Sequence, residues 1–200
     1  MLIFNQYKIF FTTMSKKQEN NKNLSPCVIL IGMMGAGKTT IGRALARELG
    51  VEFVDLDHEI VRRCGVEIPI IFDIEGEEGF RKRETAVLSE LVTQPNIVLA
   101  TGGGAIMAAC NQELLKKGKV IYLKASLDEL FARISKDTGR PLLQTENPKQ
   151  KLEQLLTLRM PIYERLANIT METSTGNIHT TVKQLKKALL DEGVISHEHC

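Results

Sequence analysis

The feature that most constrains this chain is the stretch of residues 32–39, which reads GMMGAGKT. It matches the pattern G-x-x-x-x-G-K-[ST] of a phosphate-binding P-loop. A continuously apolar run, residues 27–31, precedes it, and apolar side chains one turn apart follow it at Ile41, Leu45 and Leu49. The flanking patterns predict a strand buried on both faces before the motif and a helix after it. This is the context that a P-loop requires.

The chemistry of the motif follows from its residue types. Glycines let the backbone curl around an anion, and the following helix directs its first amides at the phosphates. Lys38 adds a positive charge, and the Thr39 hydroxyl suits a magnesium ion. By average residue usage a chance match has odds of roughly one in a hundred. The motif predicts nucleotide binding but does not name the phosphate acceptor.

Composition narrows the class of protein. The chain is 43% hydrophobic and 25% charged, which is ordinary for one globular domain. The first 25 residues hold four lysines and one glutamate, which leaves 22 basic against 23 acidic residues elsewhere. We therefore expect neither a nucleic-acid nor a membrane-surface partner. Four cysteines without C-x-x-C spacing suggest a reducing cytoplasm, and no apolar run approaches the ~20 residues of a membrane span.

The polar, Asn- and Lys-rich start predicts a disordered N-terminal extension over residues 1–25. Its first 13 residues lack the clean apolar core of a signal peptide and are interpreted as a dispensable leader. A single domain is expected over residues 26–192, with a frayed tail over 193–200. Within it we expect an insertion at about 57–84 and a lid at about 135–149.

Two aspartates follow the second expected strand, residues 52–55. Asp55 and Asp57 stand two positions apart where the carboxyl end of a parallel strand gathers ligands. A carboxylate beside a P-loop can hold magnesium through water. Alternatively, Asp57 caps a helix that begins near His58.

Residues 61–91 have a helical pattern that Pro69 and Gly76 break. Arg81 and Glu84 are spaced i, i+3, so the carboxylate can hold the guanidinium. Lys82 and Arg83 are interpreted as a solvated charged face.

A further apolar strand, residues 97–100, leads into Gly102, Gly103 and Gly104. The three glycines predict either close approach of a ligand to the backbone or a flexible hinge.

The second half adds a strand at 119–123, a helix marked by Leu130 and Ile134, and an edge strand at 168–171. The polar stretch 135–149 predicts a mobile lid or an ordinary surface loop. As a lid, it would bring Arg140 to the charge of a transferring phosphate. A helix carrying Arg159 and a closing helix around Leu185 complete the pattern.

Taken together, residues 28–190 resemble the bacterial shikimate kinases. Six blocks in the family's order carry the resemblance: 32–40, Asp55-x-Asp57, 71–81, 100–104, Arg140-Pro-Leu-Leu and Arg159-x-Pro-x-Tyr163. The resemblance implies an α/β, three-layer P-loop NTPase fold with a five-stranded parallel sheet flanked by helices, a substrate-binding insertion and a lid. It also implies a monomer that transfers the γ-phosphate of ATP to the 3-hydroxyl of shikimate, in the synthesis of chorismate and aromatic amino acids.

The family resemblance also implies residue roles. ATP would contact Gly35, Ala36, Gly37, Lys38, Thr39, Thr40, Arg133 and Arg140. Mg²⁺ would be held by Thr39 directly and by Asp55 through water. Shikimate would contact Asp57, Arg81, Gly102, Gly103, Gly104 and Arg159, and the catalytic groups would be Lys38, Asp57 and Arg140. Asp57 would accept the proton or only a hydrogen bond. Two rivals are a gluconate-kinase-like enzyme and a nucleotide-binding scaffold without catalysis.

Overall fold

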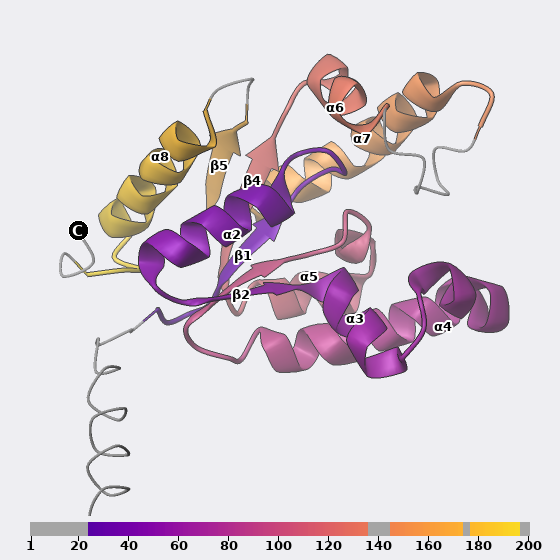
Figure 1. Cartoon of the computed structure of the whole chain (residues 1–200), viewed down its shortest axis with the longest axis horizontal. Helices are drawn as coiled ribbons and strands as arrows, with labels where there is room; N and C mark the ends of the chain where they lie inside the picture. Colours follow the sequence, from indigo (N-terminus) through magenta and orange to yellow (C-terminus); the bar gives the residue numbers. More distant parts are fainter. Residues whose placement is uncertain (1–23, 136–144, 174–176, 197–200) are drawn as a thin grey trace, which may run out of the picture.

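A computed structural model describes residues 24–135, 145–173 and 177–196 of the chain. Its centre is one five-stranded sheet in the order β2-β3-β1-β4-β5, with every neighbouring pair parallel (Figure 1). The strands are β1 (Val28–Ile31), β2 (Glu52–Asp55), β3 (Ile97–Ala100), β4 (Lys119–Lys124) and β5 (Ile169–Glu172). This confirms the expected sheet, and each strand lies within one residue of its predicted bounds.

The strand register aligns the residues that follow the strands. Ala100 of β3 pairs with Leu30 of β1 on one side and with Asp55 of β2 on the other. The P-loop, Asp57 and the glycine run therefore all begin at the same edge of the sheet. Parallel sheets bind ligands at this carboxyl edge.

Helices cover both faces of the sheet. On one face α2 (Lys38–Leu49) packs against α8 (Ile178–Asp191) (Figure 1). On the other lie α4 (Ile68–Leu91), α5 (Ala109–Leu115) and α7 (Pro148–Leu166), with the short η1 (Ala105–Met107) between them. α3 (Leu56–Cys64) and α6 (Leu127–Ile134) complete the expected three-layer arrangement.

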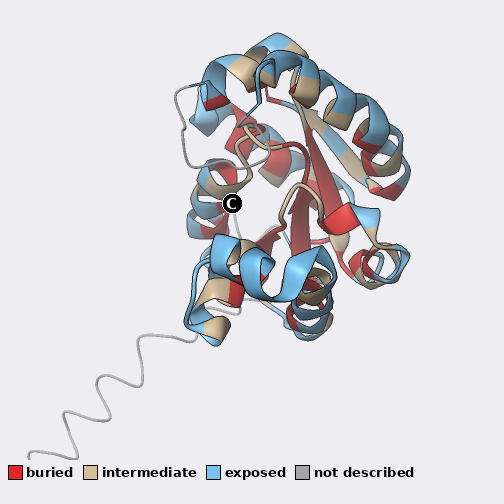
Figure 2. Ribbon diagram, turned by 90° about the vertical axis from the view of Figure 1, so that its right-hand side faces the viewer, coloured by how far each residue is buried: buried red, intermediate tan, exposed pale blue. Residues whose placement is uncertain are grey.

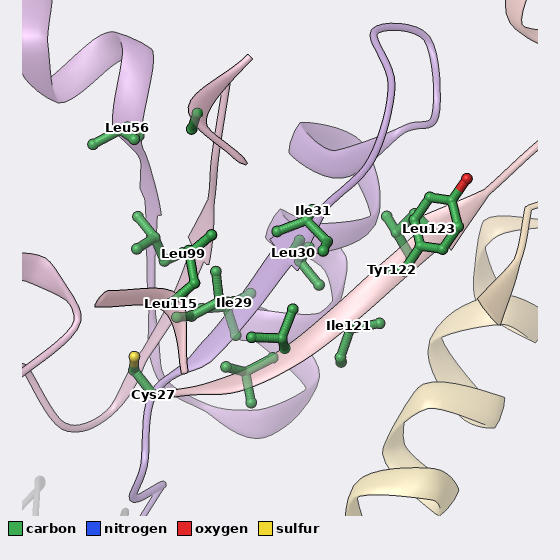
Figure 3. Close-up of a cluster of buried hydrophobic side chains, with 14 of the residues drawn as sticks. Cys27, Ile29, Leu30, Ile31, Leu56, Leu99, Leu115, Ile121, Tyr122 and Leu123 are labelled. Carbon is green, nitrogen blue, oxygen red and sulfur yellow. The ribbon is translucent and has the colours of Figure 1, made fainter. Parts of the chain in front are cut away.

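The core lies in the central strands because both of their faces are covered. Every residue of β1 and β3 is buried, whereas the edge strand β5 alternates between partly buried and exposed positions (Figure 2). Aliphatic side chains of β1, β3 and β4 form one cluster with Leu56 and Leu115 (Figure 3). The continuous apolar runs seen in the sequence are thus the buried strands of a parallel sheet.

The break predicted in the second helical segment is real. α3 ends at Cys64, and α4 starts with Pro69 in its first turn, where a missing amide is harmless. Gly76 kinks α4, with φ 69° and ψ −175°, a conformation that side chains disfavour. The residues expected to form the insertion, about 57–84, fall in α3 and in α4 up to Glu84.

Three expected boundaries need correction. Leu24 is buried, and its amide donates to Asn96 Oδ1 at 2.8 Å, so the packed domain begins before residue 26. Val194 and Ile195 are also buried, so the expected frayed tail is wrong at its start. Pro148 and Lys149 belong to α7 rather than to a lid. Residues 1–23 and most of the expected lid, 136–144, lie outside the described residues. Within the described part, no helix is both long and apolar enough to cross a membrane.

Candidate active site

The P-loop connects β1 to α2 through backbone that glycine permits. Gly32, Gly35 and Gly37 have φ values of 142°, 82° and 91°. A Cβ at Gly32 would lie 2.6 Å from the carbonyl oxygen of Leu123, so a larger residue cannot replace it without moving β4. Ala36 is buried inside the loop and Thr40 is exposed in the first turn of α2. The predicted strand, glycine loop and helix are confirmed.

Positive charge and helix amides meet at this loop. Lys38 Nζ donates to the carbonyls of Gly32 and Met33 at 2.8 and 2.9 Å, so the ammonium lies against its own loop. In the described structure no side chain caps the N-terminus of α2, where Gly37 is the N-cap residue. These amides and the ammonium suit an anion such as a nucleotide phosphate.

Two oxygen groups lie beside the loop. Thr39 Oγ1 donates to Asp55 Oδ2 at 2.9 Å. The other oxygen of Asp55 accepts from the amides of Asp57 and His58, so Asp55 is the cap of α3. The alternative in which Asp57 is the cap is wrong, because α3 begins directly after β2 and leaves Asp57 within its first turn.

A second group of side chains, which we term the acceptor cluster, consists of Asp57, Arg81, Glu84 and Arg159. They come from α3, α4 and α7 and surround the glycine run. Arg81 Nη1 donates to Glu84 Oε2 at 2.8 Å, and Nη2 donates more weakly to Glu77 at 3.3 Å. Glu84 is buried, so the ion pair fixes the Arg81 guanidinium against the interior of the protein. The predicted i, i+3 pair is confirmed.

The glycine run lies in contact with this cluster. A Cβ at Gly102 would lie 2.8 Å from Asp57 Oδ1, and one at Gly104 would lie 2.8 Å from Arg81 Nη2. At Gly103 the nearest cluster atom is Arg159 Nη1, at 3.7 Å. The backbone therefore approaches both an acid and two guanidiniums closely, which supports the close-approach interpretation of the three glycines.

Arg159 stands out within the cluster. The residue is only 6% exposed, and its Nε has no hydrogen-bond partner among the described residues. A buried donor without a partner costs free energy, about 1–3 kcal/mol and more when the group is charged. An anion bound beside it would remove that cost.

Burial shapes the protonation of the two acids of the acceptor cluster. Burial raises the pKa of Asp57, the neighbouring Asp55 raises it further, and Lys38 and Arg81 oppose the rise. Burial also raises the pKa of Glu84, against the opposing effect of Arg81. Both carboxyls are thus better proton acceptors than exposed ones.

Of the two arginines predicted to contact ATP outside the P-loop, the structure describes one. Arg133 donates from Nη1 to the carbonyl of Gly35 at 3.1 Å, and its Nη2 donates to the carbonyl of Thr173. It therefore joins the P-loop to the end of β5. Arg140 lies outside the described residues.

Sequence reasoning missed two residues that position this site. Asn111, fully buried, donates to the carbonyl of Ala105 at 2.9 Å and accepts from Thr85 Oγ1 at 2.7 Å, so it links η1, directly after the glycine run, to α4. Tyr163 belongs to a sequence motif and to a helical pattern, and in the fold its hydroxyl donates to the carbonyl of Gly103 at 2.6 Å. Its spacing of four from Arg159 was the available signal, because i, i+4 residues share a helix face. No signal pointed to Asn111.

Comparison with known proteins accounts for this arrangement. A family model described as "Shikimate kinase" matches residues 34–190. The chain belongs to the shikimate kinase family. Members are ATP-dependent kinases of shikimate, and this chain is one of them.

Relatives and solved structures of the shikimate kinase family agree with that assignment. The chain is 54% identical to the shikimate kinase of Bordetella avium over 79% of its own length and 76% of the relative's. It is 52% identical to that of Methylococcus capsulatus, over 83% and 93% of the two lengths. The Acinetobacter baumannii shikimate kinase in complex with shikimate matches with a TM-score of 0.80 and 50% identity, over 84% and 94%.

A gluconokinase from Sinorhizobium meliloti also matches, with a TM-score of 0.52 and 15% identity over 85% of this chain. A likeness at that identity shows the fold alone. The shikimate kinase assignment is therefore favoured over the gluconate-kinase-like alternative.

Proposed function

We propose that the enzyme transfers the γ-phosphate of ATP to the 3-hydroxyl of shikimate by holding the two substrates next to each other at the carboxyl edge of the sheet. The observation that carries this proposal is the buried Arg159, whose Nη1 would lie 3.7 Å from a Cβ at Gly103 and whose Nε has no hydrogen-bond partner among the described residues. A planar guanidinium suits a carboxylate, which shikimate carries and ATP does not.

On the nucleotide side, the residues for ATP are Gly35, Ala36, Gly37, Lys38, Thr39 and Thr40. The ammonium of Lys38 leaves the carbonyls of Gly32 and Met33 and moves to the terminal phosphates. Arg133 is assigned to the adenine, because it lies where the P-loop meets the end of β5. Arg140 is assigned to the transferring phosphate on the family resemblance.

The residues beside the P-loop fit a magnesium ion. Thr39 and Asp55 supply a hydroxyl and a carboxylate oxygen 2.9 Å apart, and Mg²⁺ prefers oxygen ligands supplemented by water. Thr39 would bind it directly and Asp55 through water. When bound, the ion neutralises charge on the phosphates. Few protein ligands are needed, which agrees with the absence of any group of three potential metal-binding side chains in the described residues.

On the acceptor side, Arg81 and Arg159 grip the carboxylate, and Gly102, Gly103 and Gly104 lie beside the ring. Asp57 accepts a hydrogen bond from the reacting hydroxyl. Its raised pKa makes it a better base, although a loose transition state releases the hydroxyl proton late. Positioning and charge neutralisation therefore supply most of the rate enhancement.

The proposal is tested by coupled measurement of ADP release with shikimate, with gluconate and with no acceptor. ADP release that depends on shikimate and stops when EDTA removes divalent metal supports it. Turnover that shikimate does not change contradicts it. ATP binding without transfer to any acceptor would instead favour a nucleotide-binding scaffold.

We further propose that the enzyme is a cytoplasmic monomer without nucleic-acid or membrane partners. The near-balanced charge of residues 26–200 supports the expectation of no nucleic-acid partner, and the free thiols of Cys27, Cys64 and Cys110 suit the cytoplasm. The monomer is assigned on the family resemblance. Light scattering after size exclusion should give the mass of one chain, 22.4 kDa.

A further inference from the structure

The hydroxyl of Tyr163 joins the two halves of the site. Tyr163 lies in α7, one turn after Arg159, and its side chain is fully buried. The hydroxyl donates to the carbonyl of Gly103 at 2.6 Å and lies 3.7 Å from Met33 Sδ in the P-loop. One helix thus supplies both a guanidinium and a hydroxyl to the glycine run.

The hydroxyl completes the hydrogen bonding of that run. The carbonyl of Gly102 accepts from the amide of Ala105 at 3.2 Å, and that of Gly104 accepts from the amide of Met107 at 3.0 Å. Of the three glycine carbonyls, the middle one is therefore held by a side chain instead of by η1. Because the peptide unit is planar, holding this carbonyl also fixes the amide of the peptide that joins Gly103 to Gly104. Glycine alone would not restrict that plane.

The anchored peptide lies between the two substrate sides. A Cβ at Gly103 would be 3.5 Å from both the Gly32 carbonyl and the Met34 amide, and 3.7 Å from Arg159 Nη1. The ring that holds it has little freedom, because it is buried and stacks on Tyr122 with centroids 5.1 Å apart. The position of the hydroxyl is therefore set by packing in the sheet and α7.

We infer that Tyr163 is a positioning residue, which orients the Gly103 peptide for the acceptor. The inference rests on the proposed function, since it assumes that the glycine run contacts shikimate. Without the hydroxyl the peptide plane can rotate, so the acceptor finds its backbone partners in the wrong orientation. The amides that bind ATP belong to the P-loop and keep their own geometry.

The test is Tyr163→Phe, which removes only the hydroxyl. Loss of one buried hydrogen bond predicts an increase of about tenfold in the KM for shikimate. The KM for ATP should stay within about twofold. An unchanged shikimate KM, or equal increases in both KM values, would overturn the inference. If the Tyr163 hydroxyl only stabilised the fold, Tyr163→Phe would lower the melting temperature and leave both KM values unchanged.

Tyr122→Phe is the matched control, because it removes a hydroxyl from the same stacked pair. Among the described residues the Tyr122 hydroxyl has no hydrogen-bond partner, and in Figure 3 it points away from the labelled aliphatic cluster. Both KM values should therefore equal those of the wild type. A rise in the shikimate KM equal to that of Tyr163→Phe would assign the effect to packing of the pair and overturn the inference.

A second variant restores a donor. With 4-aminophenylalanine at position 163, whose amine donates more weakly than a phenol, the shikimate KM should fall between wild type and Tyr163→Phe. If Tyr163→Phe does not fold, the 4-aminophenylalanine variant is compared with the wild type alone. A rise of a few-fold in its shikimate KM supports the inference, and an unchanged shikimate KM overturns it. Failure of the proposed function would appear separately, as wild-type turnover that does not respond to shikimate.

Discussion

The nucleotide side and the acceptor side of this site are built in different ways. The P-loop is one continuous stretch whose working groups are backbone amides and Lys38, which contacts carbonyls five and six residues away. The acceptor cluster gathers side chains from α3, α4 and α7, and the buried Nε of Arg159 has no partner within the described part of the chain. The nucleotide side is a local structure that P-loop proteins with many different acceptors can share. The acceptor side exists only in the folded chain, and in the proposed function it is the side that would distinguish one acceptor from another.

The largest effect is expected from Lys38→Ala on the nucleotide side. Loss of the ammonium should lower kcat by about 10³-fold or more, because charge on the transferring phosphate is no longer neutralised. Shikimate affinity, measured by calorimetry, should change little. Lys82→Ala is the control, since Lys82 forms an exposed pair with Glu78. A large loss of shikimate affinity in Lys38→Ala would show that Lys38 also contributes to binding of the acceptor, against the division into a nucleotide side and an acceptor side.

Arg81→Ala should change the binding of shikimate and leave the binding of ATP unchanged. The lost charge-assisted contact of about 1.5–3 kcal/mol corresponds to an increase of about 10- to 150-fold in the shikimate KM. Steady-state kinetics with each substrate varied in turn measure it. A change confined to the ATP KM would show that Arg81 has been assigned to the wrong substrate.

Glu84→Gln tests the electrostatics of the acceptor cluster through stability. A raised pKa means that the folded state binds more protons than the unfolded state between the ordinary glutamate pKa of 4.5 and the folded value. The free energy of unfolding of the wild type should therefore fall relative to that of the variant as the pH rises through this range. Urea unfolding at several pH values measures the difference.

Glu78→Gln is the control for that experiment. Pairing with Lys82 lowers the pKa of Glu78, so the stabilisation it gives is present above the ordinary pKa and lost as the pH falls. Its slope should have the opposite sign. If the wild type instead gained stability over Glu84→Gln with rising pH, Glu84 would be an ordinary stabilising ion-pair partner.

The smallest effect is expected from Glu77→Gln. Glu77 also faces Arg81, but at 3.3 Å and with 71% of its side chain exposed, so solvent screens the pair. The shikimate KM should change by less than about twofold. An increase in the shikimate KM as large as that expected for Arg81→Ala would mean that the position of Arg81 depends on this exposed contact.

The same contrast explains what the sequence could predict. Strands β1 and β3 can be predicted from their apolar runs, and the P-loop from its residue pattern, because local spacing determines them. Asp55 rather than Asp57 caps α3, since the helix begins with no intervening loop. Burial of Leu24 and Val194 depends on contacts distant in sequence, and composition alone suggested exposed ends.

The positioning residues were harder still to predict. Asn111 looks like any helical asparagine until the fold places it between Ala105 and Thr85. Tyr163 has a motif and a spacing, but its partner, Gly103, is 60 residues away. Side chains that hold backbone carbonyls leave little trace in a single sequence, because many residue types satisfy the local pattern.

The most direct test of the account is a crystal structure of the enzyme with shikimate bound. We predict that the carboxylate lies between Arg81 and Arg159 and accepts a hydrogen bond from Arg159 Nε at about 2.9 Å. The ring should lie against Gly103, with a hydroxyl near Asp57. A carboxylate bound elsewhere, with Arg159 Nε still lacking a partner, would contradict the account.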